Sequence, residues 1–206
     1  MSATKTVFLI RHAESRNNVD KRETARLFRR LCRGILPSCA QLRHMLALLK
    51  VEMNSSLSSY GQAQVARQHE TLSSANFIGT SGVQLIVHSP LVRAKETCSR
   101  LFPEQTVPMM EHSELFEKDI GEHLGWRRLS SRVRSFEEWL EARSESHIVI
   151  VGHSAFFRCM VPGIKPKNVE VWKAEFDAGS GVASRWSAPQ LCFAGPDPTH
   201  HVEDPP

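Results

Sequence analysis

The sequence predicts an α/β fold, a three-layer α/β/α sandwich with a mostly parallel central sheet. Three short apolar runs, at residues 7–10, 85–87 and 148–151, have the length and composition of strands buried on both faces. A polar loop and then a segment of helical period follow each run, and this alternation is typical of layered α/β proteins. Reactive side chains in such folds lie at the carboxyl ends of the strands. The residues at those ends are Arg11, His12, His88, Ser89 and His153.

The remaining segments complete one domain over residues 1–186. We expect a fourth strand at 106–110 and a later one at 169–176, whose alternating pattern suits a sheet edge. Residues 21–53 form a basic helical insertion that is either a solvated face or a lid gathering negative charge. Residues 187–206 are rich in proline and polar side chains, and we expect this tail to pack little.

Bulk composition points to an intracellular protein. The 206 residues carry a net charge of +4, which favours anionic substrates but is too small to argue for nucleic acid. The five cysteines are odd in number and lack metal-ligand spacing, so they read as reduced thiols. We see neither a membrane-spanning run nor a signal peptide, and predict a cytoplasmic protein without membrane or nucleic-acid partners.

The first strand ends in Arg11-His12, a pair suited to attack on phosphorus. A neutral imidazole supplies an electron pair, and the adjacent guanidinium offers planar donors that match phosphate oxygens. The pair Arg43-His44 lies within an apolar pattern of helical period and is interpreted as an ordinary surface pair. The position at a strand end is therefore what distinguishes His12.

Five segments, in order, resemble the histidine phosphatase superfamily, also called phosphoglycerate mutase-like. The first resembles the family's histidine signature, with Ala13 where Gly is usual. The others resemble the Leu-Thr-x-x-Gly helix start, the Ser-x-x-x-Arg-Ala-x-x-Thr segment, the acid loop and the second-histidine strand. The five segments are residues 11–18, 57–64, 88–97, 115–121 and 149–158.

The resemblance implies a role for each matching side chain. His12 would attack the phosphorus and carry a phosphohistidine, with its other ring nitrogen protonated against a backbone carbonyl. Arg11, Arg93 and His153 would bind the phosphoryl oxygens. Asn18 matches a further phosphate-contacting position. Ser154, which follows the second histidine, is also assigned to phosphate binding.

The leaving group requires a proton, and the resemblance assigns the general acid to Glu117. Phosphate charge and partial burial would favour the protonated carboxyl. Glu114 and Asp119 are its rivals on the same segment. The acid-phosphatase branch instead places Asp directly after the second histidine, where this chain has Ser154.

These features predict a phosphoric monoester hydrolase that needs no metal or organic cofactor. Its substrate is a phosphorylated small molecule or phosphoprotein, selected by residues 21–53 and 124–134; the oligomeric state stays open. The alternatives are mutase-type phosphoryl transfer and a non-catalytic phospho-ligand binder. A serine hydrolase is also conceivable, because residues 152–156 imitate a nucleophile elbow, but Phe156 replaces its final glycine.

Overall fold

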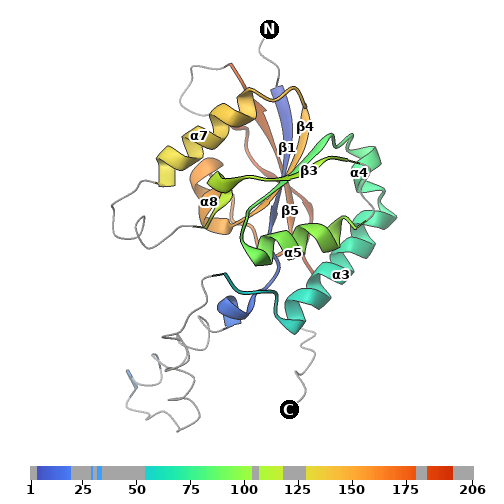
Figure 1. Cartoon of the computed structure of the whole chain (residues 1–206), viewed down its shortest axis with the longest axis vertical. Coiled ribbons are helices and arrows are strands. Elements are labelled where there is room, and N and C mark those ends of the chain that lie inside the picture. The colour runs from blue at the N-terminus through green and yellow to red at the C-terminus, as the bar shows by residue number, and fades with distance from the viewer. Residues whose placement is uncertain are drawn as a thin grey trace.

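A six-stranded sheet with helices on both faces forms the centre of the computed structural model (Figure 1). The structure describes residues 4–19, 29, 32–33, 54–103, 107–117, 129–179 and 185–196. Neighbouring strands follow the order β3-β2-β4-β1-β5-β6. The strands are β1 (Thr4–Arg11), β2 (Leu85–His88), β3 (Met109–Glu111), β4 (His147–Gly152), β5 (Val171–Asp177) and β6 (Gln190–Phe193).

The predicted α/β sandwich is confirmed, and its sheet is mostly parallel. β3, β2, β4 and β1 pair in parallel, whereas β5 and β6 add two antiparallel pairings. The predicted strands at 7–10, 85–87 and 148–151 lie within β1, β2 and β4. The strand expected at 106–110 begins only at Met109, although residues 104–106 lie outside the described part.

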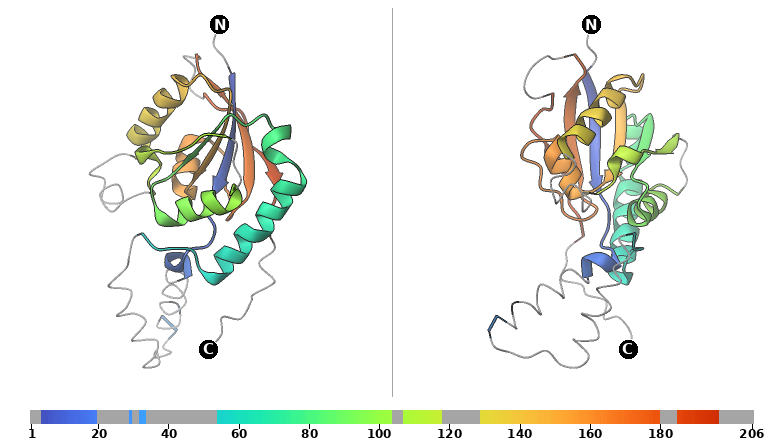
Figure 2. Two further views of the ribbon diagram at one scale, coloured as in Figure 1. Left: turned by 45° about the vertical axis from the view of Figure 1, so that its right-hand side comes forward. Right: turned by 60° about the vertical axis from the view of Figure 1, so that its left-hand side comes forward.

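Helices cover the two faces in two separate groups (Figure 2). One face carries α3 (Ser59–Ser74), α4 (Phe77–Thr80) and α5 (Val92–Leu101). The other carries α7 (Leu129–Glu141) and α8 (Ser154–Met160). Because strand side chains alternate, Phe8 and Ile10 join the first core, and Val7 and Leu9 join the second.

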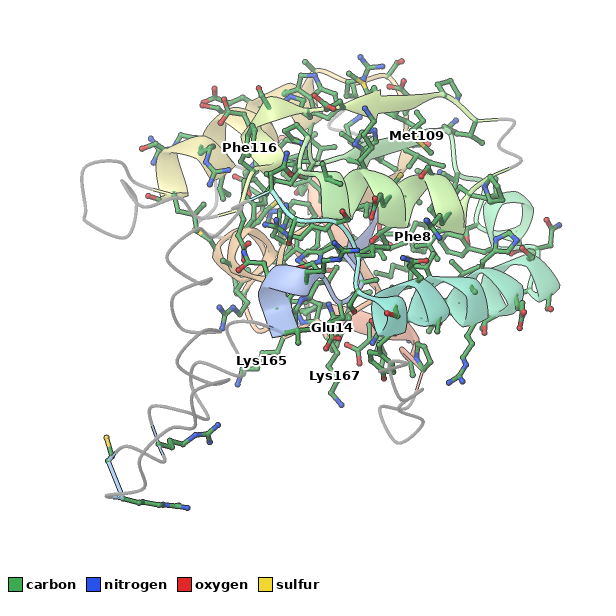
Figure 3. All side chains as sticks on the ribbon, turned by 60° about the horizontal axis from the view of Figure 1, so that its bottom comes forward. Phe8, Glu14, Met109, Phe116, Lys165 and Lys167 are labelled. Atoms are coloured by element: carbon green, nitrogen blue, oxygen red, sulfur yellow. The ribbon has the colours of Figure 1, made fainter. Side chains whose placement is uncertain are left out.

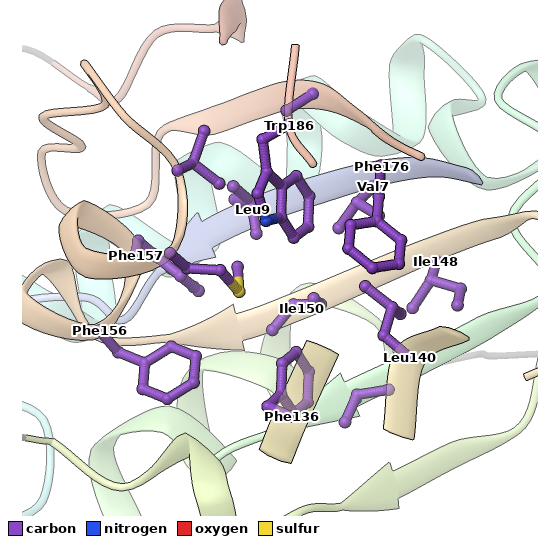
Figure 4. Packing of buried hydrophobic residues seen from close by; sticks show 14 of the residues in the cluster. Val7, Leu9, Phe136, Leu140, Ile148, Ile150, Phe156, Phe157, Phe176 and Trp186 are labelled. Atoms are coloured by element: carbon purple, nitrogen blue, oxygen red, sulfur yellow. The ribbon is translucent and has the colours of Figure 1, made fainter. Parts of the chain in front are cut away.

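Aromatic side chains fill the core beneath α7 and α8 (Figure 4). Phe136 of α7 meets Phe156 of α8 edge to face at 5.7 Å between ring centroids. Both rings are fully buried. Truncating such a ring to alanine costs about 3–5 kcal/mol. This packing anchors α8, and therefore His153 at its start, to the sheet.

Two expectations about the end of the chain were wrong. The strand predicted at 169–176 is not the sheet edge, because β6 pairs antiparallel with β5 and takes that place. Part of the predicted loose tail is thus built into the fold. Phe193 of β6 packs edge to face on Phe77 at 5.7 Å. The apolar contact, together with the free edge of β5, outweighs the polar composition of the segment.

The basic insertion at 21–53 lies almost wholly outside the described residues, as does the pair Arg43-His44. Both interpretations of the insertion therefore stay predictions. None of the described helices is long and apolar enough to cross a membrane.

Candidate active site

Three parallel strands deliver the predicted reactive residues to one edge of the sheet. Arg11 at the end of β1 pairs with Gly152 of β4, and His88 of β2 pairs with Val151. Backbone hydrogen bonds between these segments continue one residue beyond the ends of β1 and β2. The amide of His12 donates to the carbonyl of Gly152 at 3.0 Å, and that of Ser89 to Val151 at 3.0 Å. Residues that are far apart in sequence therefore meet.

The two predicted site histidines face each other. The ring centroids of His12 and His153 lie 5.0 Å apart, and the side chains are 2% and 0% exposed. Nδ1 of His12 donates to the carbonyl of Ala13 at 2.6 Å, which accounts for the expected backbone partner. This bond holds the proton on Nδ1, so the lone pair of the ring is on Nε2.

His153 is held neutral with one nitrogen unused. Its Nε2 lies 2.8 Å from the hydroxyl of Ser89, and its buried Nδ1 has no hydrogen-bond partner among the described residues. Burial lowers the pKa of His153 well below its ordinary value, and electrostatic interactions with His12, Arg93, Arg11 and Arg132 lower it further. A neutral ring that accepts from Ser89 can present Nδ1–H to an anion.

Two arginines bring buried positive charge to the same place. Arg93, in the first turn of α5, is only 2% exposed. Burial lowers the pKa of both Arg11 and Arg93, and the carboxylate of Glu117 offsets part of that effect. Nη1 of Arg11 donates to the carbonyl of Pro166 at 3.2 Å, but its buried Nε has no hydrogen-bond partner among the described residues. A bound anion would compensate the desolvation of both guanidiniums.

Glu117 is the rim carboxylate that the structure brings to the cluster. It follows the 3-10 helix η1 (Ser113–Leu115) and accepts a 2.6 Å bond from Nη2 of Arg93. Its side chain is 33% exposed, so the carboxyl lies between buried cations and solvent. The contact with Arg93 singles out Glu117 over Glu114, whereas Asp119 lies outside the described residues.

The loop after β1 is held by the helix start that resembled the family. Ser58 caps α3 and donates its amide to the carbonyl of Glu14 at 3.0 Å. A Cβ at Gly61 would lie 1.9 Å from that carbonyl oxygen, so only glycine permits the approach. Oε1 of Gln64 accepts the amide of Glu14 at 2.9 Å. The motif therefore positions the loop rather than the substrate.

Two other predicted site residues lie beside the cluster, and neither assignment to phosphate is tested. The amide oxygen of Asn18 accepts from the backbone amide and hydroxyl of Ser15, at 3.1 and 2.6 Å, so it stabilises the turn. Ser154 begins α8, one residue after His153. The hydroxyl paired with Nε2 of His153 is that of Ser89, so this contact gives Ser154, the serine of the predicted nucleophile elbow, no histidine base.

Sequence reasoning missed one arginine that organises the acid loop. Nη1 of Arg132, on α7, donates to the carbonyls of Glu114 and Phe116 at 2.6 and 2.5 Å, and Nη2 to that of Glu117 at 3.4 Å. Because these partners are backbone atoms, no residue pattern marks the contact. No group of three or more metal-binding side chains occurs within the described part of the chain.

Comparison with protein families gives a match to part of the chain. The family model of the histidine phosphatase superfamily (branch 1) matches residues 44–128. No curated protein sequence matches the chain significantly.

Solved structures share the fold at low sequence identity. Bacillus stearothermophilus YhfR superposes with a TM-score of 0.59 and 15% identity, covering 89% of this chain and 95% of its own. A mycobacterial glucosyl-3-phosphoglycerate phosphatase gives 0.56 and 16%, covering 94% and 100%. The protein histidine phosphatase SixA, complexed with tungstate, gives 0.51 and 12%, covering 91% and 94%. The family model confirms the predicted resemblance to the histidine phosphatase superfamily over residues 44–128, and the solved structures confirm the fold.

Proposed function

We propose that this protein is a phosphatase that hydrolyses phosphomonoesters through a phosphohistidine on His12, with Glu117 as the general acid. The observation that carries the proposal is a pair of buried nitrogens without hydrogen-bond partners among the described residues, Nε of Arg11 and Nδ1 of His153. Arg11 interacts electrostatically with His153, whose ring lies 5.0 Å from that of His12. Native proteins rarely bury polar atoms without partners, and these belong to cationic or neutral donors. A tetrahedral oxyanion is the ligand that would engage both while facing a nucleophile.

The first step forms the phosphoenzyme. Nε2 of His12 attacks phosphorus in line, and the bond between phosphorus and the ester oxygen breaks. The departing oxygen takes a proton from the Glu117 carboxyl. The imidazole becomes cationic, and the carbonyl of Ala13 then accepts from a more acidic Nδ1–H.

The second step returns the enzyme to its starting state. Water attacks phosphorus, its proton passes to the Glu117 carboxylate, and the P–N bond breaks to leave neutral His12 and inorganic phosphate. Arg11, Arg93 and His153 contact the equatorial oxygens in both steps. Charge on these oxygens persists through a loose transition state, so fixed cations are the main protein contribution.

Substrate binding would also change the state of Glu117. In the structure its carboxylate neutralises Arg93 at 2.6 Å. A phosphoryl group would compete for that guanidinium and repel the carboxylate, which releases Glu117 from Arg93 so that it can face the leaving group. The ion pair is thus interpreted as the resting state of the acid.

The structural neighbours support a phosphatase without specifying its substrate. One is described as acting on glucosyl-3-phosphoglycerate and another is a protein histidine phosphatase that holds tungstate, a tetrahedral oxyanion like phosphate. Their range keeps both small phosphoesters and phosphoproteins open. The mutase alternative depends partly on residues 118–128, which lie outside the described part.

The decisive experiment traps the intermediate. Wild-type protein is mixed with a 32P-labelled phosphomonoester, quenched in base and mapped by peptide sequencing. We expect base-stable, acid-labile label on His12, none in His12→Ala, and unchanged labelling in His69→Gln, whose imidazole bonds Leu101 at the far end of α3. Binding without label would favour the non-catalytic binder. Transfer between phosphoglycerates without phosphate release would favour the mutase.

A further inference from the structure

A short segment between α8 and β5 lies against the loop that carries His12. We call residues 166–170 the strap. The amide of Val169 donates to the carbonyl of Arg11 at 2.9 Å, and Nη1 of Arg11 donates to the carbonyl of Pro166 at 3.2 Å. The strap therefore contacts Arg11, the residue before His12, at both the backbone and the side chain of Arg11.

The strap also holds the peptide bond that follows His12. Nδ2 of Asn168 donates to the carbonyl of His12 at 2.6 Å. On the other side of the same peptide, the amide of Ala13 donates to the hydroxyl of Thr97 at 3.0 Å. Both polar groups of one peptide unit are thus fixed by side chains from opposite sides, one from the strap and one from α5.

This peptide controls the proton on the nucleophile. The next carbonyl along the chain, that of Ala13, accepts from Nδ1 of His12 at 2.6 Å. Rotation of the His12–Ala13 peptide would change the direction of the following carbonyl. The Nδ1 proton would then lose its acceptor, and the tautomer with its lone pair on Nε2 would no longer be favoured.

Backbone strain points to the same segment. Val169 is fully buried and has a φ of 54°, a left-handed conformation that β-branched residues rarely adopt. Such outliers cost on the order of 1–3 kcal/mol and persist where the surroundings impose them. Glu170 is one such constraint, because its Oε2 accepts from the amide of Lys167 at 2.8 Å and from the indole of Trp172 at 2.9 Å.

We propose that Asn168 is a positioning residue, which holds the His12–Ala13 peptide so that Ala13 fixes the reactive tautomer of His12. The inference rests on the proposed function, in which Nε2 of His12 is the nucleophile. Asn168 itself touches no reacting atom. Its effect is therefore on the rate of phosphoryl transfer to His12 rather than on affinity for phosphate.

Two variants of Asn168 test this role. Asn168→Ala removes the donor, and Asn168→Asp keeps the shape but places an acceptor against the His12 carbonyl. We expect the rate of His12 phosphorylation to fall about 10- to 100-fold, the range that a displacement of about 1 Å can cause. Affinity for vanadate should stay within about threefold, because Arg11, Arg93 and His153 remain.

A spectroscopic reading separates positioning from general stability. Nitrogen-15 NMR of the histidine rings should show His12 with its proton on Nδ1 in the wild type, and an increased Nε2–H form in both variants. Trp186→Phe is a matched control: it loses the bond from the indole to Glu137, near the opposite end of β1. This control should change neither the His12 tautomer nor the phosphorylation rate.

The outcomes keep the two proposals apart. Absence of label on wild-type His12 contradicts the proposed function, and the NMR comparison still decides whether Asn168 sets the tautomer. Label on the wild type with an unchanged rate and tautomer in folded Asn168→Ala or Asn168→Asp overturns the role of Asn168. A folded variant with weaker vanadate binding but the wild-type phosphorylation rate also overturns it.

Discussion

The two sides of the candidate site differ in how firmly they are held. The nucleophile side is buried, and side chains from α3, α5 and the strap bind successive peptide groups between Arg11 and Ser15. The acid side follows a 3-10 turn, and Glu117 on it is one-third exposed. The contrast indicates a fixed geometry for the phosphoryl group and an accessible surface for the leaving group. Figure 3 labels Glu14 on the nucleophile side and Phe116 on the acid side.

Arg93 connects the two sides, so its loss should have the largest effect. Arg93→Ala removes a buried cation from the phosphoryl group and the partner of Glu117. We expect kcat/KM to fall by up to about a thousandfold, as for loss of one preorganised donor at a developing charge. Steady-state hydrolysis of a phosphomonoester measures this. Arg100→Ala, at the other end of α5, is the control and should retain wild-type activity.

The loss of activity caused by a substitution on the acid side should depend on the leaving group of the substrate. The loss caused by a substitution on the nucleophile side should not. Glu117→Gln keeps the hydrogen-bonding shape but cannot supply a proton. For alkyl phosphates we expect a loss of about a hundredfold in kcat/KM, the lower range for general acids. p-Nitrophenyl phosphate releases a stable anion and should lose much less. Equal losses on both substrates would argue against Glu117 as the acid.

Arg132 offers a way to loosen the acid side. Arg132→Ala removes the guanidinium that binds the carbonyls of Glu114 and Phe116. We expect about a tenfold loss in kcat with alkyl phosphates, because a displaced general acid transfers its proton less efficiently. Labelling of His12 by p-nitrophenyl phosphate should change little. A larger loss with p-nitrophenyl phosphate than with alkyl phosphates would show that Arg132 serves the phosphoryl side.

The smallest expected effect concerns stability against pH. Burial lowers the pKa of His153 below its ordinary value of 6.5, so the unfolded chain binds more protons. The free energy of unfolding should therefore decrease as pH falls below about 6.5. His153→Gln should reduce this slope in urea denaturation between pH 7 and pH 5. Some slope should remain, because burial also lowers the pKa of His112. An unaltered slope would contradict a neutral His153.

The sequence predicted the parts of the fold that depend on composition over several residues. Continuous apolar runs identified β1, β2 and β4, because strands buried on both faces need such runs. It could not predict β6, because prolines flank its four residues and the segment forms a strand by pairing with the otherwise free edge of β5. Pairing of this kind depends on tertiary neighbours more than on local propensity.

The candidate site shows the same division. Residues proposed to act through their own functional groups were identified from motifs and meet in the structure, as His12, His153 and Arg93 do. Arg132 and Asn168 were missed because they act by binding backbone carbonyls. A carbonyl is present at every residue, so such contacts leave no pattern in sequence. Asn18 shows the converse, since a motif position there also stabilises a local turn.

The place of β1 in the sheet has a consequence for how the protein is made. β1 lies between β4 and β5, so both its partners come from the second half of the chain. During synthesis the segment bearing His12 leaves the ribosome before either partner, since its pairing with β4 extends to residue 152 and its pairing with β5 to residue 177. Contacts between such distant segments slow folding and prolong exposure to aggregation. The site around His12 would therefore form only after both later segments have been made.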